Sequence, residues 1–180
     1  MTSNWSLVKK TNKIAVSLAD DHYSRQKIGS REIGPPGQKI VLLNHDHTAV
    51  WGSHRPAPWA GIERLDKFSG SSCFIFRNTG DTLSSILIRE AVGITALRWG
   101  DDPFITYVAL NRIRSSNPGF CFLKAGFDRV GYNSKTKLGL MARLEMSSIE
   151  VIKCRNEITD PEYWTNVLPD GRVPLPIMSG

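Results

Sequence analysis

The sequence predicts an α/β (α+β) domain in which a mixed sheet of six to seven strands is flanked by helices. The chain has 180 residues, of which 41% are hydrophobic, and this is enough for one sizeable core. Short apolar runs with strand character alternate with segments whose apolar residues recur at the helical period. In the centre, Cys73–Phe76 has the pattern of a strand and passes through a polar turn, 77–82, into a helix over 83–99. Strands alternating with helices in this way are typical of an α/β domain.

The other elements are expected on both sides of this centre. A strand-like lead-in over 1–10 precedes a short helix over 11–21, which Thr11 or Asn12 can cap. A loop rich in Gly and Pro follows, and then a hairpin of strands at 40–43 and 49–53. Beyond the centre we expect a strand at 105–110, a polar loop at 111–118, a short helix at 119–125 and a hairpin turning at 133–137. The domain spans 1–150, and residues 151–180 form a tail that packs on it or extends from it.

The central turn is the predicted seat of a cofactor or substrate phosphate. The helix that follows can be capped by Asp81 or Thr82 and ends at Gly100. Its apolar stripe is expected to consist of Leu83, Ile86, Leu87, Ala91, Ile94 and Leu97. A strand that enters a helix through a polar turn aims unpaired N–H groups at an anion bound there. The residues expected to hold that anion are Arg77, Asn78, Gly80, Thr82, Ser84 and Ser85. The alternative is an ordinary strand–helix connection without a ligand.

Composition limits the class of protein. Lys and Arg number 23 against 17 Asp and Glu, a net charge of +6 that weakly favours a polyanionic partner such as nucleic acid. No apolar run is long enough to span a bilayer, and the N-terminus lacks a signal-peptide core, so we expect a cytoplasmic protein without a membrane partner. The three cysteines are widely spaced and are expected to be buried free thiols. They are Cys73, Cys121 and Cys154.

Two resemblances sharpen these expectations. The segment L-K-A-G-F-D-R-V-G at 123–131 resembles the C-terminal signature of GNAT acyltransferases, although the turn supplies only Gly80 of the usual glycine-rich phosphate loop. Over 20–131, the runs H-Y-S-R, G-P-P-G-Q-K, F-R-N-T-G-D-T and N-P-G-F-C-F-L-K-A-G-F resemble phage Mom-type DNA modification proteins. That family has an atypical GNAT domain that attaches a carbamoylmethyl-type group to adenine N6 in DNA and protects phage DNA from restriction. The resemblance implies double-stranded DNA as partner, the host cytoplasm, acetyl-CoA or another acyl or glycine-derived donor, and a link to iron.

The resemblance also implies roles for single residues. Mom-type proteins carry a His-Tyr pair where this chain has His22 and Tyr23, so these are the predicted catalytic residues, acting on the proton of the adenine amine. His22 is also the preferred ligand if a metal binds. The alternative is a histidine favoured by a helix C-terminus beside a half-buried tyrosine. Tyr107 is on the strand where acyltransferases open the sheet to admit the acyl group. Its side chain is expected either to line that opening or to lie in the core.

DNA contacts are expected from two basic loops at one edge of the sheet. Trp51, Trp59 and Tyr23 are candidates for stacking on an extruded base, with a core role as the alternative for the two tryptophans. His45 and His47 form a second candidate metal pair, with a solvated turn as the alternative. The loop residues expected to bind DNA are Ser24, Arg25, Lys27, Arg31, Lys39, Arg112 and Arg114.

Three functions follow from these observations. The first is DNA adenine modification by a GNAT-like transferase. The second keeps the fold and acetylates a small amine or a protein with acetyl-CoA. The third is a basic phage protein without enzymatic activity that binds DNA or a host factor.

Overall fold

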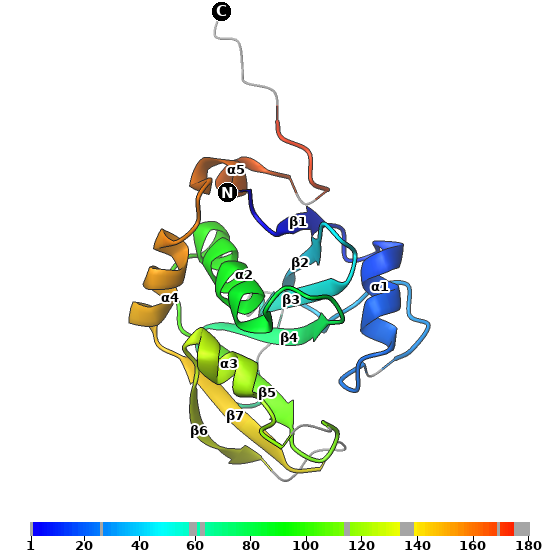
Figure 1. The fold of residues 1–180 in the computed structure, drawn as a ribbon, viewed down its shortest axis with the longest axis vertical. Helices are drawn as coiled ribbons and strands as arrows, with labels where there is room; N and C mark the ends of the chain where they lie inside the picture. Colours follow the sequence, from blue (N-terminus) through cyan, green and yellow to red (C-terminus); the bar gives the residue numbers. More distant parts are fainter. Residues whose placement is uncertain are drawn as a thin grey trace, which may run out of the picture.

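The computed structural model describes residues 2–25, 27–57, 61, 64–113, 116–133, 139–168 and 170–174 (Figure 1). Within them lies a seven-stranded sheet in the order β1-β2-β3-β4-β5-β7-β6. Only β4 and β5 are parallel among the neighbouring strands described, which confirms the predicted mixed sheet. The strands are β1 (Trp5–Val8), β2 (Gln38–Asn44), β3 (Ala49–Arg55), β4 (Ser71–Asn78), β5 (Phe104–Ala109), β6 (Asp128–Asn133) and β7 (Met141–Met146).

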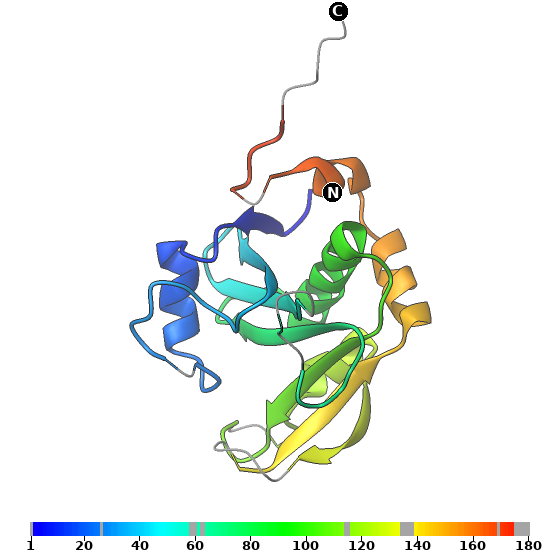
Figure 2. The same ribbon diagram turned by 180° about the vertical axis from the view of Figure 1, so that it is seen from behind.

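Helices cover both faces of the sheet (Figures 1 and 2). One face carries α2 (Ser84–Trp99), α3 (Phe120–Ala125), α4 (Ser148–Asn156) and α5 (Pro161–Asn166), and the other carries α1 (Lys13–Asp20). Side chains alternate across the strands. Leu42 and Trp51 therefore join the core under α2, whereas Val41 and Val50 join the smaller core under α1.

The helix ends confirm part of the prediction. The side chain of Asn12 accepts hydrogen bonds from the amides of Ile14 and Ala15 and caps α1, as expected. Gly100 ends α2 with a φ of 102°. The predicted cap of α2 by Asp81 or Thr82 is wrong, because Leu83 holds the N-cap position and gives no side-chain hydrogen bond.

The apolar stripe predicted for α2 is only partly right. Leu83 and Ile86 are exposed, at 66% and 50%, although both belong to the predicted stripe. Ile88 and Val92, outside it, are fully buried. The middle of α2 is covered by the sheet on one side and by α3, α4 and α5 on others, so burial there is not confined to one stripe.

Residues 151–168 pack against the main core. Val151, Cys154 and Trp164 are fully buried in the main core. Arg98 of α2 donates hydrogen bonds to the carbonyl oxygens of Trp164 and Val167, at 2.7 and 2.9 Å. The residue at which the C-terminal segment was expected to begin, 151, lies inside α4.

β4 carries a bulge where it pairs with β3. Gly52 pairs with Ile75 and Ser53 with Cys73, which leaves Phe74 as an extra residue in β4. A Cβ atom on Gly52 would lie 2.3 Å from the Cζ atom of Phe74, so the ring lies directly over this glycine. A bulge of this kind bends the strand and increases its twist.

β4 and β5 diverge after residues 72 and 105. β4 pairs with β5 only at Ser71↔Phe104 and Ser72↔Ile105. We call the diverging parts, residues 73–78 of β4 and 106–109 of β5, the fork. At its closed end the hydroxyl of Thr106 donates a hydrogen bond to the carbonyl oxygen of Cys73, 3.2 Å away.

Candidate active site at the fork between β4 and β5

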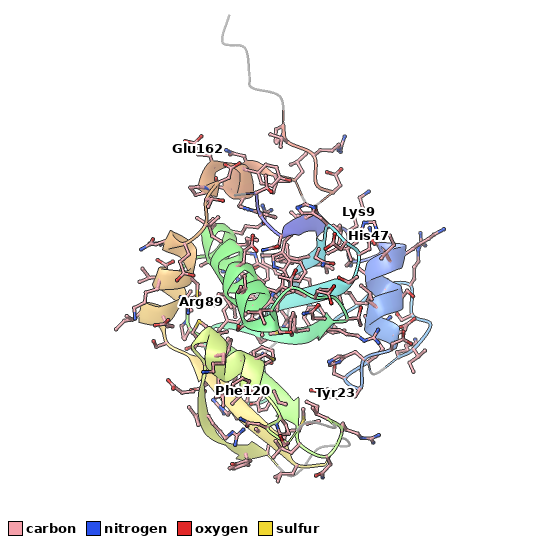
Figure 3. The ribbon with its side chains drawn as sticks, in the orientation of Figure 1. Lys9, Tyr23, His47, Arg89, Phe120 and Glu162 are labelled. Carbon is pink, nitrogen blue, oxygen red and sulfur yellow. The ribbon has the colours of Figure 1, made fainter. Side chains whose placement is uncertain are left out.

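The segment that follows α1 lies at the fork and contacts both strands. The amide of Ala109 on β5 donates to the hydroxyl of Tyr23, with 3.4 Å between nitrogen and oxygen. The Oγ atom of Ser24 is 3.5 Å from the carbonyl oxygen of Phe74, and the backbone of Phe76 lies close enough to the imidazole of His22 to raise its pKa. Figure 3 shows Tyr23 below α1, toward the end of β5. Three consecutive residues therefore lie between the diverging parts of β4 and β5.

His22 is a neutral imidazole at this place. Burial, and to a smaller extent the positive charge of Arg77, lower its pKa to about 4 against the opposing effect of the Phe76 backbone. Its ring centroid is 4.3 Å from that of Tyr23. Its Nδ1 atom is 2.7 Å from the Oγ atom of Ser24. At pH 7 His22 can accept a proton without first losing one.

Tyr23 keeps its proton. Burial is the main cause that raises the pKa of its hydroxyl, and the thiols of Cys73 and Cys121 add to this. Burial likewise raises the pKa of both thiols. All three cysteines are free, and Cys73 and Cys154 are buried as predicted, whereas Cys121 is half-buried. The fork thus holds a protonated phenol beside a neutral imidazole.

The turn into α2 is built by Asn78. Its amide nitrogen donates to the carbonyl of Thr82 at 2.7 Å and to the hydroxyl of Ser84 at 3.0 Å, and its oxygen accepts from the amide of Gly80 at 3.0 Å. In the part of the chain that the structure describes, the amides of Ser84 and Ser85 have no hydrogen-bond partner. This arrangement leaves donors at a helix N-terminus, where the helix dipole favours an anion.

Two of the residues that were expected to bind the donor, Arg77 and Tyr107, make their contacts away from this turn. Arg77 places its Nη1 atom 3.3 Å from Asp21 and from the carbonyl of Leu18, so its charge lies at the end of α1 beside His22. Tyr107 donates its hydroxyl proton to Asp66 at 2.9 Å. Burial alone would raise the pKa of Asp66, but its hydrogen bonds with Arg64, the Phe68 amide and Tyr107 bring it down to about 2. The turn therefore brings together Asn78, Gly80, Thr82, Ser84 and Ser85, without Arg77 and Tyr107.

The residues predicted to bind DNA fall into two groups, and those of the first group are bonded within their own loop. Arg25 donates to Asp20 at 2.7 Å and to the carbonyls of Ser30 and Glu32, both at 3.0 Å, and its side chain is 7% exposed. Burial lowers the pKa of Lys39, whose Nζ atom donates to the carbonyl of Ile33 at 3.2 Å. These two cations hold their own loop in place.

The remaining predicted contacts have different positions. Lys27, Arg31 and Arg112 are exposed, whereas Arg114 and Trp59 lie outside the described residues. Trp51 is fully buried and belongs to the core, which rules out its stacking on a base in this conformation.

A pocket of about 370 Å³ adjoins the fork. Ser24 and Phe74 form the wall nearest the fork, and the Gly-Pro segment 34–36 forms another. Three charged residues line it: Arg25, which is paired with Asp20, Glu32, which is paired with Lys10, and Lys27. This pocket can receive a second substrate next to His22 and Ser24.

Metal binding finds no support. Over the described residues there is no group of three or more His, Cys, Asp and Glu side chains that could hold an ion. His45 and His47 lie exposed in the turn after β2, and the Nε2 atom of His45 is 2.7 Å from the carbonyl of Ser3.

The fold can now be compared with known proteins. No family model matches the sequence, and no curated protein matches it either. Among solved structures, the chain is similar to a spermidine N-acetyltransferase chimera from Vibrio cholerae and hSSAT, with a TM-score of 0.57. The match covers 84% of this chain and 99% of the other. The chain has the GNAT acetyltransferase fold. Only 10% of the aligned residues are identical, so the likeness concerns the fold alone.

This likeness confirms the fold that the resemblance to GNAT acyltransferases implies, whereas nothing in these comparisons supports DNA modification of the Mom type. None of the helices over the described residues is long and apolar enough to span a bilayer. The sequence carries one signal for the bent strand beside the fork. Gly52 interrupts a strand of large residues, and an isolated glycine in a strand often marks a bulge or a close approach.

Proposed function

We propose that the chain is an N-acyltransferase that uses a phosphate-bearing thioester donor of the acetyl-CoA type. The observation that carries this proposal is the fork on a GNAT-fold sheet, with His22, Tyr23 and Ser24 placed across it. The donor would bring an acyl group to the fork and hand it to an amine.

The first turn of α2 would hold the donor's phosphates. The unpartnered amides of Ser84 and Ser85 supply hydrogen bonds and a favourable dipole. Leu83 and Ile86 are exposed at the same end of the helix and offer apolar surface to the rest of a long donor. Thr82 completes the turn that we assign to the donor.

The proton chemistry would fall to His22 and Tyr23. His22 is neutral at pH 7 and can take the proton that the amine loses when it attacks the acyl carbon. Tyr23 retains its proton, since burial raises its pKa, and can give it to the leaving thiolate. Each residue is in the protonation state that its role requires.

The acceptor would enter the pocket beside Ser24. Among the described lining residues, the carboxylate of Glu32 is engaged by Lys10, so no unpaired acid is available to bind a polycation such as a polyamine. The exposed Lys27 at its rim favours a neutral or anionic molecule that carries the amine. A small amine or a protein amine of this charge is the first candidate.

Adenine in DNA is the second candidate acceptor. It is favoured by the exposed cations Lys27, Arg31 and Arg112 and by the net charge of +6. Mass spectrometry of nucleosides from plasmid DNA tests it, after expression of the wild type and of the His22→Ala variant. A modified adenosine that depends on His22 would support DNA as substrate, and unmodified adenosine in both samples would contradict it.

Calorimetry with acetyl-CoA tests the proposal as a whole, followed by an assay of thiol release with a panel of amines. Gly80→Ala should weaken binding, because a Cβ atom there would lie 2.3 Å from the Oγ1 atom of Thr48 and distort the turn. Gly131→Ala is the matched control, since nothing lies within 4 Å of its Cβ position. Absence of both binding and acyl transfer in the wild type would refute the proposal.

A further inference from the structure

The proton positions on His22 and Ser24 can be deduced from their hydrogen bonds. The backbone amide of Ser24 donates to Nδ1 of His22 at 3.1 Å, and the Oγ atom of Ser24 lies 2.7 Å from the same nitrogen. A backbone amide can only donate, so Nδ1 must carry a lone pair rather than a proton. The hydroxyl of Ser24 has one proton, and we assign it to the shorter contact with Nδ1 rather than to the Phe74 carbonyl at 3.5 Å. The proton of the neutral ring is then on Nε2.

We propose that Ser24 is a nucleophile that carries the acyl group as an ester between donor and acceptor. The proposal deepens the acyltransferase function and rests on it for the natural donor. The arrangement has two parts of an activated serine: a nucleophile, and a neutral base within hydrogen-bond distance of it. The backbone amide of Ser24 donates to the same nitrogen of the base and fixes its tautomer.

The position of Ser24 fits this role. Its Oγ atom lies 3.5 Å from the carbonyl oxygen of Phe74 in the fork, and Ser24 also lines the acceptor pocket. The donor in the fork and the amine in the acceptor pocket would thus both be able to reach Ser24. The charged or titratable groups that face His22 are Arg77, which is paired with Asp21, and the ring of Tyr23.

The two steps balance without another reactant. In the first, Oγ of Ser24 attacks the carbonyl carbon of the thioester and its proton passes to Nδ1 of His22. The carbon–sulfur bond breaks, and the thiolate leaves with a proton, which leaves an ester on Ser24 and free thiol. In the second, the amine attacks the ester carbon, the bond to Oγ breaks, and the amine's proton returns through His22 to Ser24. The products are the amide and the original enzyme.

A second serine and histidine in the chain provide a matched control. The Oγ atom of Ser6 lies 3.3 Å from Nδ1 of His45, whose Nε2 atom is 2.7 Å from the carbonyl of Ser3. The residue types are those of the site, but this pair is solvent-exposed, its hydrogen bond is longer, and neither residue lines the acceptor pocket. We expect no chemistry there.

The test uses p-nitrophenyl acetate, which supplies an acetyl group without needing a phosphate seat. Full-length protein without an acceptor should release a stoichiometric burst of p-nitrophenolate and gain the mass of one acetyl group, which peptide mapping places on Ser24. Ser24→Ala should abolish both. His22→Gln should slow the burst by roughly 10²- to 10⁴-fold, the usual contribution of a general base. Ser6→Ala should behave as the wild type.

Acetyl-CoA in place of the ester separates this proposal from the broader one. If Ser24→Ala transfers acetyl from acetyl-CoA to an amine at the wild-type rate, the covalent step is refuted and the acyltransferase function stands. If acetyl-CoA does not bind but p-nitrophenyl acetate acetylates Ser24, the nucleophile stands and the proposed donor is wrong. An acetyl group on any other residue, or an equal burst in Ser24→Ala and the wild type, overturns the assignment of Ser24.

Discussion

The hydroxyl oxygen of Tyr23 lies 3.4 Å from the backbone nitrogen of Ala109, which is 86 residues further along the chain. Ala109 belongs to the part of β5 that has separated from β4, so its amide has no strand partner on that side. The tyrosine takes the place of that partner and joins the loop after α1 to the far arm of the fork. One hydrogen bond thus links the predicted catalytic loop to the bent sheet.

Tyr23→Phe should weaken both stability and turnover. Removing the hydroxyl leaves the buried amide of Ala109 without an acceptor, which should lower the free energy of unfolding by about 1 kcal/mol, and by up to about 3 if no water replaces it. Turnover should fall by roughly 10²-fold or more if Tyr23 is the proton donor. Urea unfolding and the thiol-release assay measure the two effects. Tyr132→Phe, at a residue that is 59% exposed on β6, should change neither.

Gly52→Ala should disturb the bulge. Its methyl group would lie 2.3 Å from the ring of Phe74, and overpacking of this kind costs about 1 to 3 kcal/mol of unfolding free energy. Because the ring's position fixes the bend of β4, binding of acetyl-CoA should weaken as well. Gly131→Ala, in β6, has open space around it and should have little effect on either quantity. Equal unfolding midpoints for Gly52→Ala and the wild type would contradict this account of the bulge.

Stability should fall in acid because of His22. Its pKa is about 4 in the folded chain and 6.5 as the reference value, so the unfolded chain binds the proton more readily. The contribution is fully present above pH 6.5 and is lost as the pH falls toward 4; it amounts to at most about 3 kcal/mol. Urea unfolding at pH 7 and pH 4.5 should therefore show a smaller loss for His22→Gln than for the wild type. The same loss in both proteins would show that His22 does not titrate as described.

Arg77→Gln should shift the acid limb of the activity profile to higher pH. The charge of Arg77 is one of the causes that lower the pKa of His22, so its removal raises that pKa. The pH dependence of kcat/KM measures the shift. If Arg77 instead binds the donor's phosphate, the variant should lose affinity for acetyl-CoA while the acid limb stays where it is.

The sheet and most helices could be predicted because local patterns decide them. The alternation of apolar residues, the cap at Asn12 and the stop at Gly100 are read from neighbouring residues. The C-terminal helices could not be predicted in the same way. Trp164 is buried only because α5 docks against α2, a contact between distant segments. Similarly, the start of α2 at Ser84 follows from the hydrogen bonds of Asn78 rather than from a capping side chain.

The candidate site was only partly visible in the sequence. His22 and Tyr23 were found through a family resemblance, and the structure brings them to the fork. The roles expected for Arg25 and Lys39 depended on charge alone, and charge does not tell a free cation from one that is bonded to loop carbonyls. The effect of the Phe76 backbone on His22 has no sequence signal, because any residue at that position would supply a backbone.

Amide hydrogen exchange with and without acetyl-CoA tests the central claim most directly. If the donor lies at the fork, protection should appear at residues 74–86, covering β4, the turn and the first turn of α2, and at the loop that carries His22. Exchange in β1 and in α5 should not change. Protection confined to other segments, or none at saturating acetyl-CoA, would contradict the assignment of the fork as the acyl-donor site.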